Sequence, residues 1–185
     1  MSALIQQFGD IDIYLFDQLL RGRIRPEMQI LDAGCGGGRN LVYFRREGFD
    51  VWAVDASPTM TGWDRFHVAE IDNMPFESSR FDVVISSAVL HFARNSAHFD
   101  SMLHEMWRVL RPGGLLFCRL ASTIGMPNLT PGRGILPDGS ERFLVDAAML
   151  LDRTAALGGQ LVDPLKTTVV HEMRCMTTWV VRKAC

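Results

Sequence analysis

Residues 30–40 read Ile-Leu-Asp-Ala-Gly-Cys-Gly-Gly-Gly-Arg-Asn, which is an apolar run followed by a cluster of glycines. The apolar residues at 28–33 predict a short buried strand, and residues 40–47 predict the helix that follows. Glycines between a strand and a helix permit positive φ angles and let a ligand approach the main chain. The first amides of the helix are free donors. This stretch therefore predicts a loop that binds a nucleotide or a nucleoside.

Strands and helices alternate along the chain on both sides of this loop. Such alternation favours a parallel sheet with helices on both faces and a ligand crevice at the carboxyl ends of the strands. We expect an α/β fold with a doubly wound, mostly parallel seven-stranded sheet (Rossmann-like) and an antiparallel C-terminal hairpin. The expected strands are 28–33, 49–54, one near residue 68, 81–87, 115–120, 167–170 and 176–181; the expected helices are 11–21, 40–47, 98–110 and 144–157.

The length of 185 residues fits one ordinary domain, so we expect residues 1–185 to form a single domain. Residues 1–22 are expected to be an N-terminal helical cap. Residues 121–142 are rich in glycine and proline and predict a long irregular segment. Such a segment is often a lid over a binding site, and the alternative is a solvated connector.

The composition is that of a globular protein, with 48% hydrophobic residues, 22% charged residues and a net charge of −2. The charges form no basic stripe, so no nucleic-acid partner is expected. No apolar run is long enough to span a membrane. The first residues lack the features of a secretory signal, and a cytoplasmic location is expected. The four cysteines lack metal-ligand spacing, so no metal is expected, and the oligomeric state stays open.

Two residues help to distinguish the ligand of the glycine loop. If Gly34 is the first glycine of a dinucleotide fingerprint, the third would fall at position 39, where the chain has Arg39. Asp32 ends the strand, and its carboxylate suits a cation better than a pyrophosphate. The loop therefore favours a cationic nucleoside, and a nicotinamide-dependent oxidoreductase is the less favoured alternative.

A second carboxylate, Asp55, ends the next strand of the chain. It lies 21 residues after Gly34. At about this spacing a carboxylate can accept hydrogen bonds from the hydroxyl groups of a ribose. The alternative is that Asp55 caps the turn that begins at Ser57. We expect the ribose role, because strand, spacing and residue type agree.

Over residues 28–120 the chain resembles the class I S-adenosylmethionine-dependent methyltransferases. It is most similar to their small single-domain subgroup (methyltransferase type 11/12), which includes tellurite-resistance-type enzymes. The resemblance implies S-adenosylmethionine as cofactor, S-adenosylhomocysteine as product and a small-molecule methyl acceptor as partner. The chain departs from the family at 58–68, where the helix must be short or irregular. The matching segments are residues 30–40, 51–57, 70–76, 81–87 and 111–114.

The resemblance also implies which residues hold the cofactor. Asp72 would bond the adenine amino group, and the alternative is that it caps a turn before Met74. Ser87 and Ala88 would flank the methionine part. Trp63 either covers the adenine or, as we favour, fills the core. The expected cofactor-binding residues are Asp32, Gly34, Gly36, Asp55, Ala56, Ile71, Asp72, Asn73 and Ser87.

Methyl transfer from a sulfonium depends largely on positioning and desolvation, so no catalytic dyad is required. If the acceptor must lose a proton, His91 is the candidate base, because it follows the fourth strand and its ordinary pKa is near neutrality. The alternative for His91 is a role in the loop or the pocket wall, and His171 is a weaker candidate. A non-catalytic, regulatory S-adenosylmethionine-binding protein is the alternative function. The acceptor side is expected to use Tyr14, Phe16 and residues 121–142, with Arg133, Arg142, Lys166 and Arg174 as possible anion ligands or surface charges.

Overall fold

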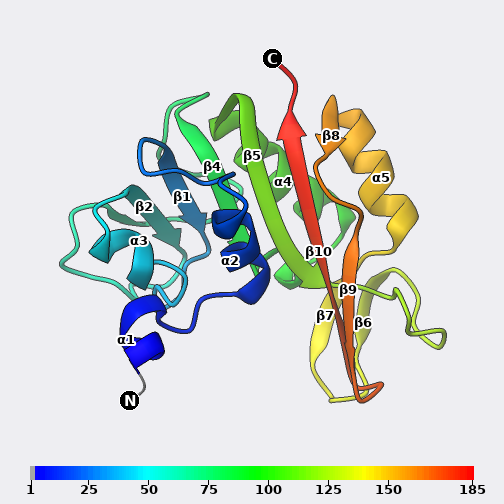
Figure 1. Ribbon diagram of the computed structural model, residues 1–185. Helices are drawn as coiled ribbons and strands as arrows, with labels where there is room; N and C mark the ends of the chain where they lie inside the picture. Colours follow the sequence, from blue (N-terminus) through cyan, green and yellow to red (C-terminus); the bar gives the residue numbers. More distant parts are fainter. Residues whose placement is uncertain (1–2) are drawn as a thin grey trace.

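The computed structural model describes residues 3–185 and has a twisted central sheet with helices on both faces (Figure 1). The helices are α1 (Ala3–Phe8), α2 (Ile13–Leu20), α3 (Val42–Arg46), α4 (Ser96–Val109) and α5 (Ala147–Ala156), with a 3₁₀ turn, η1 (Leu90–Phe92). The strands of the sheet are β1 (Gln29–Ala33), β2 (Asp50–Asp55), β3 (Phe66–Val68), β4 (Phe81–Ser87), β5 (Leu110–Ala121), β8 (Gly159–Leu161), β9 (Lys166–Val170) and β10 (Arg174–Lys183).

The strand order is β3-β2-β1-β4-β5-β10, followed by β8 and β9, which share the outer edge of β10. Strands β1 to β5 are parallel to one another, and β10 is antiparallel to β5, β8 and β9. The described residues thus form eight strands in seven positions. The predicted fold class, a doubly wound and mostly parallel sheet with an antiparallel C-terminal hairpin, is confirmed.

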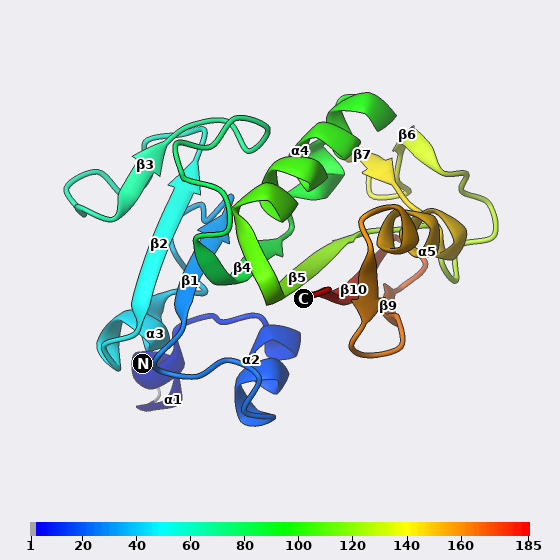
Figure 2. The same ribbon diagram turned by 90° about the horizontal axis from the view of Figure 1, so that it is seen from above.

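The sheet separates two apolar cores, because successive residues of a strand point to opposite faces. Ile30 and Val83 belong to the core under α2 and α3. Their neighbours Leu31 and Val84 belong to the core under α4 and α5. Figure 2 shows α1, α2 and α3 on one side of the sheet and α4 and α5 on the other. Burial on both faces explains why the central strands read as nearly continuous apolar runs.

Three local expectations need correction. Residues 121–142 are only partly irregular, since they contain β6 (Gly132–Ile135), which pairs with β7 (Glu141–Leu144) in an antiparallel hairpin. Alternating glycines in β6 concealed this strand, because glycine has low strand propensity. Residues 58–65, where a short or irregular helix was expected, form turns before β3. The N-terminal segment holds two short helices, α1 and α2, and residues 1–2 of the expected cap lie outside the described residues.

The carboxyl ends of the parallel strands face the same side of the molecule. In Figure 1 this is the lower side, where α1 and the β6–β7 hairpin also lie. The glycine loop after β1, the turn after β2 and the segment after β4 therefore converge there, as expected for a doubly wound sheet. None of the described helices has the length and apolarity needed to cross a membrane.

Candidate functional site

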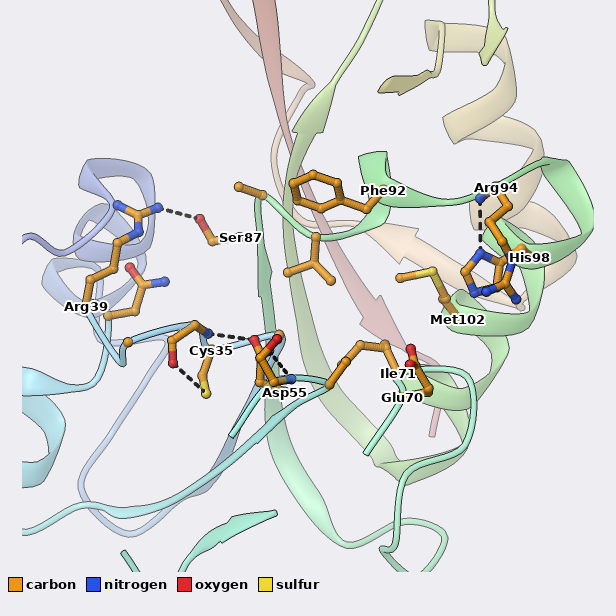
Figure 3. Close-up of a pocket in the computed structure, with 18 residues that line it drawn as sticks. Cys35, Arg39, Asp55, Glu70, Ile71, Ser87, Phe92, Arg94, His98 and Met102 are labelled. Carbon is orange, nitrogen blue, oxygen red and sulfur yellow. Dashed lines mark hydrogen bonds between the residues drawn. The ribbon is translucent and has the colours of Figure 1, made fainter. Parts of the chain in front are cut away.

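A cavity of about 600 Å³ opens at the carboxyl ends of β1, β2 and β4 (Figure 3). Six of the nine residues expected to bind the cofactor line it: Gly34, Gly36, Asp55, Ala56, Ile71 and Ser87. The other three, Asp32, Asp72 and Asn73, are not part of its wall. We call this space the first cavity.

The glycine loop forms one wall of the first cavity. Gly34 has a φ of +84°, and a Cβ atom there would lie 2.4 Å from a methyl carbon of Val89. At Gly36 φ is +52°, and a Cβ would meet no atom within 4 Å. The first glycine is therefore required by its conformation and by packing against the segment after β4. The second leaves open space where a ligand can lie against the backbone.

Asp55 joins the glycine loop to the turn after β2. Its two carboxylate oxygens accept hydrogen bonds from the amides of Gly36, at 2.8 Å, and of Ser57, at 2.9 Å. The turn-capping role that the sequence left open is therefore present. Each oxygen has further acceptor capacity, because a carboxylate offers about four lone-pair sites. Capping the turn and accepting ribose hydroxyls are thus compatible.

Asp32 lies behind this loop at the end of β1 and is only 1% exposed. No hydrogen bond of good geometry reaches either carboxylate oxygen from the described residues. Burial raises the pKa of Asp32 to about 7, against smaller opposing effects of the Arg39 charge and of the nearby Asn40 side chain. A buried carboxyl with so little hydrogen bonding is unfavourable in free energy, and a cation nearby would relieve that cost. This residue fits a positively charged ligand in the first cavity.

The end of the first cavity at Ser87 is held by a buried residue that the sequence analysis missed. Asp12, which caps α2, is 2% exposed, and it accepts hydrogen bonds from the Ser87 hydroxyl and from Arg119, both at 3.1 Å. Arg39 also donates to the Ser87 hydroxyl, at 3.1 Å. Ala88 follows with a φ of +64°, a strained conformation for a residue other than glycine. The turn after β4 is therefore fixed by partners from three distant segments.

On the side of the first cavity where the adenine is expected, Asp72 does not itself line the wall. Its carboxylate lies 3.4 Å from Nε2 of His98. His98 itself lines the cavity together with Met102, one turn further along α4, and Glu70 (Figure 3). His98 and Met102 are four residues apart on the helix after β4, so the sequence could have indicated that both side chains lie on one helix face and line the same cavity.

Cys35 is another lining residue that was not among the predicted ligands. Burial, followed by the nearby charges of Asp32 and Asp55, raises the pKa of its thiol to about 12. The thiol therefore stays protonated at neutral pH and serves as a wall of the cavity rather than as a nucleophile.

His91 lies in η1 and lines a different, second cavity of about 340 Å³. Its Nδ1 accepts a hydrogen bond from the Ala121 amide at 3.2 Å. Burial, aided by the Arg142 charge, lowers the pKa of His91 to about 4. A neutral ring whose Nδ1 is an acceptor carries its proton on Nε2. In this state His91 can donate a hydrogen bond to the cavity but cannot take a proton at Nε2, which argues against its expected role as a base.

The remaining predicted side chains separate into two groups. Arg142 and Arg174 line the second cavity. Arg133 pairs with Glu141 at 2.8 Å, and Lys166 pairs with Asp17 at 3.3 Å, so both are surface charges. His171 lines neither cavity. Trp63 packs beside the core under α2 and α3, as favoured, with Arg45 over its ring, and the Tyr14 hydroxyl bonds Thr168, a residue of the second cavity.

Comparison with known proteins shows which proteins this part of the chain resembles. Residues 31–118 match a family model described as a methyltransferase domain. The match contains most of β1, the glycine loop, Asp55 and the segment from Ser87 to Met102, which build the first cavity. Over these residues the chain is similar to methyltransferases, and several of the curated relatives that it resembles are named as methyltransferases.

Particular relatives extend the likeness along the chain. An uncharacterized methyltransferase of Synechocystis is 34% identical over 99 residues, which are 50% of this chain and 46% of that protein. A ubiquinone/menaquinone biosynthesis C-methyltransferase of Bordetella parapertussis is 31% identical over 170 residues, 77% of this chain and 65% of that protein. The chain spans about half the length of the curated relatives it matches.

A solved structure shares the fold. It is a 1,6-didemethyltoxoflavin-N1-methyltransferase of Burkholderia thailandensis with bound 1,6-didemethyltoxoflavin and S-adenosylhomocysteine. The TM-score is 0.69 at 21% identity, over 90% of this chain and 76% of that chain. At this identity the likeness establishes the fold and nothing finer.

Proposed function

We propose that this protein transfers a methyl group from S-adenosylmethionine to a small-molecule acceptor. The observation that carries the proposal is the combination, at one cavity, of an open glycine backbone with two carboxyl groups, Asp55 at the wall and the buried Asp32 behind it. A sulfonium nucleoside has the hydroxyls and the positive charge that these groups would satisfy.

In this proposal each part of the first cavity has a role. Asp55 accepts the ribose hydroxyls while it keeps its bonds to the loop. Ala56 and Ile71 flank the adenine. Asp32 places negative charge behind the glycine loop, and Ser87 borders the methionine part. Bound S-adenosylmethionine supplies an electrophilic methyl group, and its sulfur keeps the bonding electron pair.

Asp72 and Asn73 enter the proposal differently from the direct contacts first expected. Asp72 orients His98 through their 3.4 Å contact, and His98 in turn forms part of the wall near the adenine. Asn73 lies beside this pair in the same turn, and we assign it no contact of its own.

Positioning and exclusion of water supply the main catalytic effect in this proposal. His91 acts as a hydrogen-bond donor at the acceptor side, because its Nδ1 is engaged by Ala121. The turn of Ser87 and Ala88 fixes the passage between the cofactor and the acceptor.

Isothermal titration calorimetry with S-adenosylhomocysteine and with NAD tests the cofactor half of the proposal. We expect binding of the former and none of the latter. Transfer of labelled methyl from S-adenosylmethionine to a panel of small oxygen, nitrogen and sulfur nucleophiles tests the catalytic half. Cofactor binding without turnover on any acceptor would favour the non-catalytic alternative, and NAD binding alone would overturn the proposal.

A further inference from the structure

The second cavity lies directly beside the first. The two cavities share Ala88 and Phe92 in their walls. Apart from His91 of η1, the rest of the second cavity comes from β5, the β6–β7 hairpin and the β9–β10 hairpin, which Figure 1 shows together at the carboxyl-end side of the sheet. A molecule in the second cavity would therefore lie next to one in the first.

The second cavity carries an excess of positive charge. Arg142 and Arg174 line it, and neither forms an ion pair with a carboxylate within 4.0 Å among residues 3–185. One carboxylate, Asp138, belongs to the wall, and its Oδ1 already accepts from the amide and the hydroxyl of Ser140, at 2.9 Å and 2.6 Å. Two unpaired guanidinium groups against one carboxylate leave a net charge of about +1.

Arg119 also lines this cavity but differs from the other two arginines. Its Nη1 lies 3.1 Å from the fully buried carboxylate of Asp12, so its charge is balanced within the protein. Arg119 thus serves to hold the turn after β4. The charge available to a ligand belongs to Arg142 and Arg174.

Arg142 is positioned at the junction of the two cavities. Its guanidinium lies 4.8 Å from the centre of the Phe92 ring, and Nη1 donates to the Glu141 carbonyl at 2.7 Å. Both contacts fix the side chain while they leave other N–H groups free, since a guanidinium has five donors. The Nε2–H group of His91 is a further donor, and Leu136 and Val170 add apolar surface.

We propose that the second cavity is the acceptor site and that the acceptor is an anion, with a carboxylate-type oxyanion bound by Arg142 and Arg174 and an apolar part against Leu136 and Val170. This inference rests on the proposed function and adds the chemical class of the substrate to it. Guanidinium groups suit such a ligand because they form charge-assisted, often bidentate, hydrogen bonds with planar oxyanions.

The test measures small probes on the protein saturated with S-adenosylhomocysteine. The probes are arylalkanoic acids of increasing length, beginning with 3-phenylpropanoate, each compared by calorimetry with its neutral amide. We expect at least one acid to bind about tenfold or more tightly than its amide. The double variant Arg142→Gln/Arg174→Gln should abolish this preference. Arg133→Gln is the matched control, because Arg133 lies in the same hairpin, pairs with Glu141 and lines neither cavity.

The outcomes separate this inference from the proposed function. Three outcomes would overturn the inference. The acids and their amides could bind equally well, no acid could bind at all, or the preference for the acid could persist in the double variant. In each of these cases S-adenosylhomocysteine still binds and the proposed function stands. If S-adenosylhomocysteine itself fails to bind, the proposed function is overturned and the inference with it.

Discussion

The substitution Asp55→Ala tests the placement of the ribose. Two charge-assisted hydrogen bonds to the hydroxyls would be lost, and water can replace them only in part. We expect a total loss of about 1.5–3 kcal/mol of binding free energy. That corresponds to an increase of about 10- to 150-fold in the Kd of S-adenosylhomocysteine, measured by isothermal titration calorimetry.

The same substitution also removes the acceptor for the Gly36 and Ser57 amides, so the stability of the loop must be measured separately. The loss of two such bonds is expected to lower the free energy of unfolding by about 1–3 kcal/mol in urea. Asp50→Ala is the matched control. Asp50 begins the same strand, accepts from Gln29 at 2.7 Å and from Trp52 at 3.1 Å, and does not reach the cavity.

The control should show a comparable loss of stability with an unchanged Kd. If Asp55→Ala binds S-adenosylhomocysteine as tightly as the unsubstituted protein, the ribose is not at Asp55. If Asp50→Ala weakens binding equally, the effect comes from general loosening of the sheet. Only a loss of affinity confined to Asp55→Ala supports the assigned role.

Further predictions concern the glycine loop and two buried titratable groups. Gly34→Ala should lower the free energy of unfolding by about 3 kcal/mol, because the added Cβ would lie 2.4 Å from Val89. In Gly37→Ala the added Cβ meets no atom within 4 Å, so the free energy of unfolding should change by under about 0.5 kcal/mol while cofactor binding weakens. Equal losses of stability of the two variants in urea would contradict this prediction. In the folded protein the pKa of Asp32 is about 7, above its ordinary value of 3.8. The protonated carboxyl therefore contributes fully to stability below pH 3.8. As the pH rises from 3.8 to 7, the free energy of unfolding falls by up to about 1.4 kcal/mol per pH unit. In urea unfolding across pH 4–8, Asp32→Asn should lack this pH-dependent loss of stability. S-adenosylmethionine should bind the unsubstituted protein more tightly as the pH approaches 7. The folded pKa of His91, about 4, lies below its ordinary 6.5, so its contribution is present above pH 6.5 and is lost as the pH falls toward 4. The side-chain NMR signals of His91 should therefore not titrate between pH 5 and 8, and a midpoint near 6.5 would restore its candidacy as a base.

Much of the first cavity was predictable from the sequence, because the residues that line it follow the ends of strands. Gly34 and Asp55 come directly after β1 and at the end of β2, and parallel strands bring their carboxyl ends together. The strand β4 was predicted with the bounds it has, since a run buried on both faces is nearly all apolar. At these strands the local hydrophobic pattern and the overall fold agree, and this agreement is why the position of the first cavity could be predicted.

The long-range contacts around the second cavity and the turn after β4 were not predictable in the same way. Asp12 and Arg119 are 107 positions apart, and nothing in the neighbourhood of either residue signals that they meet. Arg142 was one of several arginines in a segment that read as irregular, and its distinction from Arg133 depends on which of them Glu141 pairs with. Those choices are made by tertiary packing, which residue type and spacing do not encode.

The two cavities differ in the charged groups around them, and this difference bears on the order of events in the proposed reaction. The first cavity has Asp55 and Glu70 in its wall and Asp32 behind it, together with Arg39 and Arg94, and the second has Arg142 and Arg174, which form no ion pair among the described residues. S-adenosylmethionine carries a sulfonium charge that S-adenosylhomocysteine lacks, so in the proposed binding mode methyl transfer would remove a positive charge near Asp32. The attraction between the Asp32 carboxylate and the cofactor is then weaker than before the transfer, and the pKa of Asp32 returns toward 7. We therefore expect S-adenosylmethionine to bind more tightly than S-adenosylhomocysteine above pH 7, and the difference to diminish in Asp32→Asn. The buried Asp32 carboxyl, which destabilises the protein without cofactor when it is ionised, would thereby favour release of S-adenosylhomocysteine.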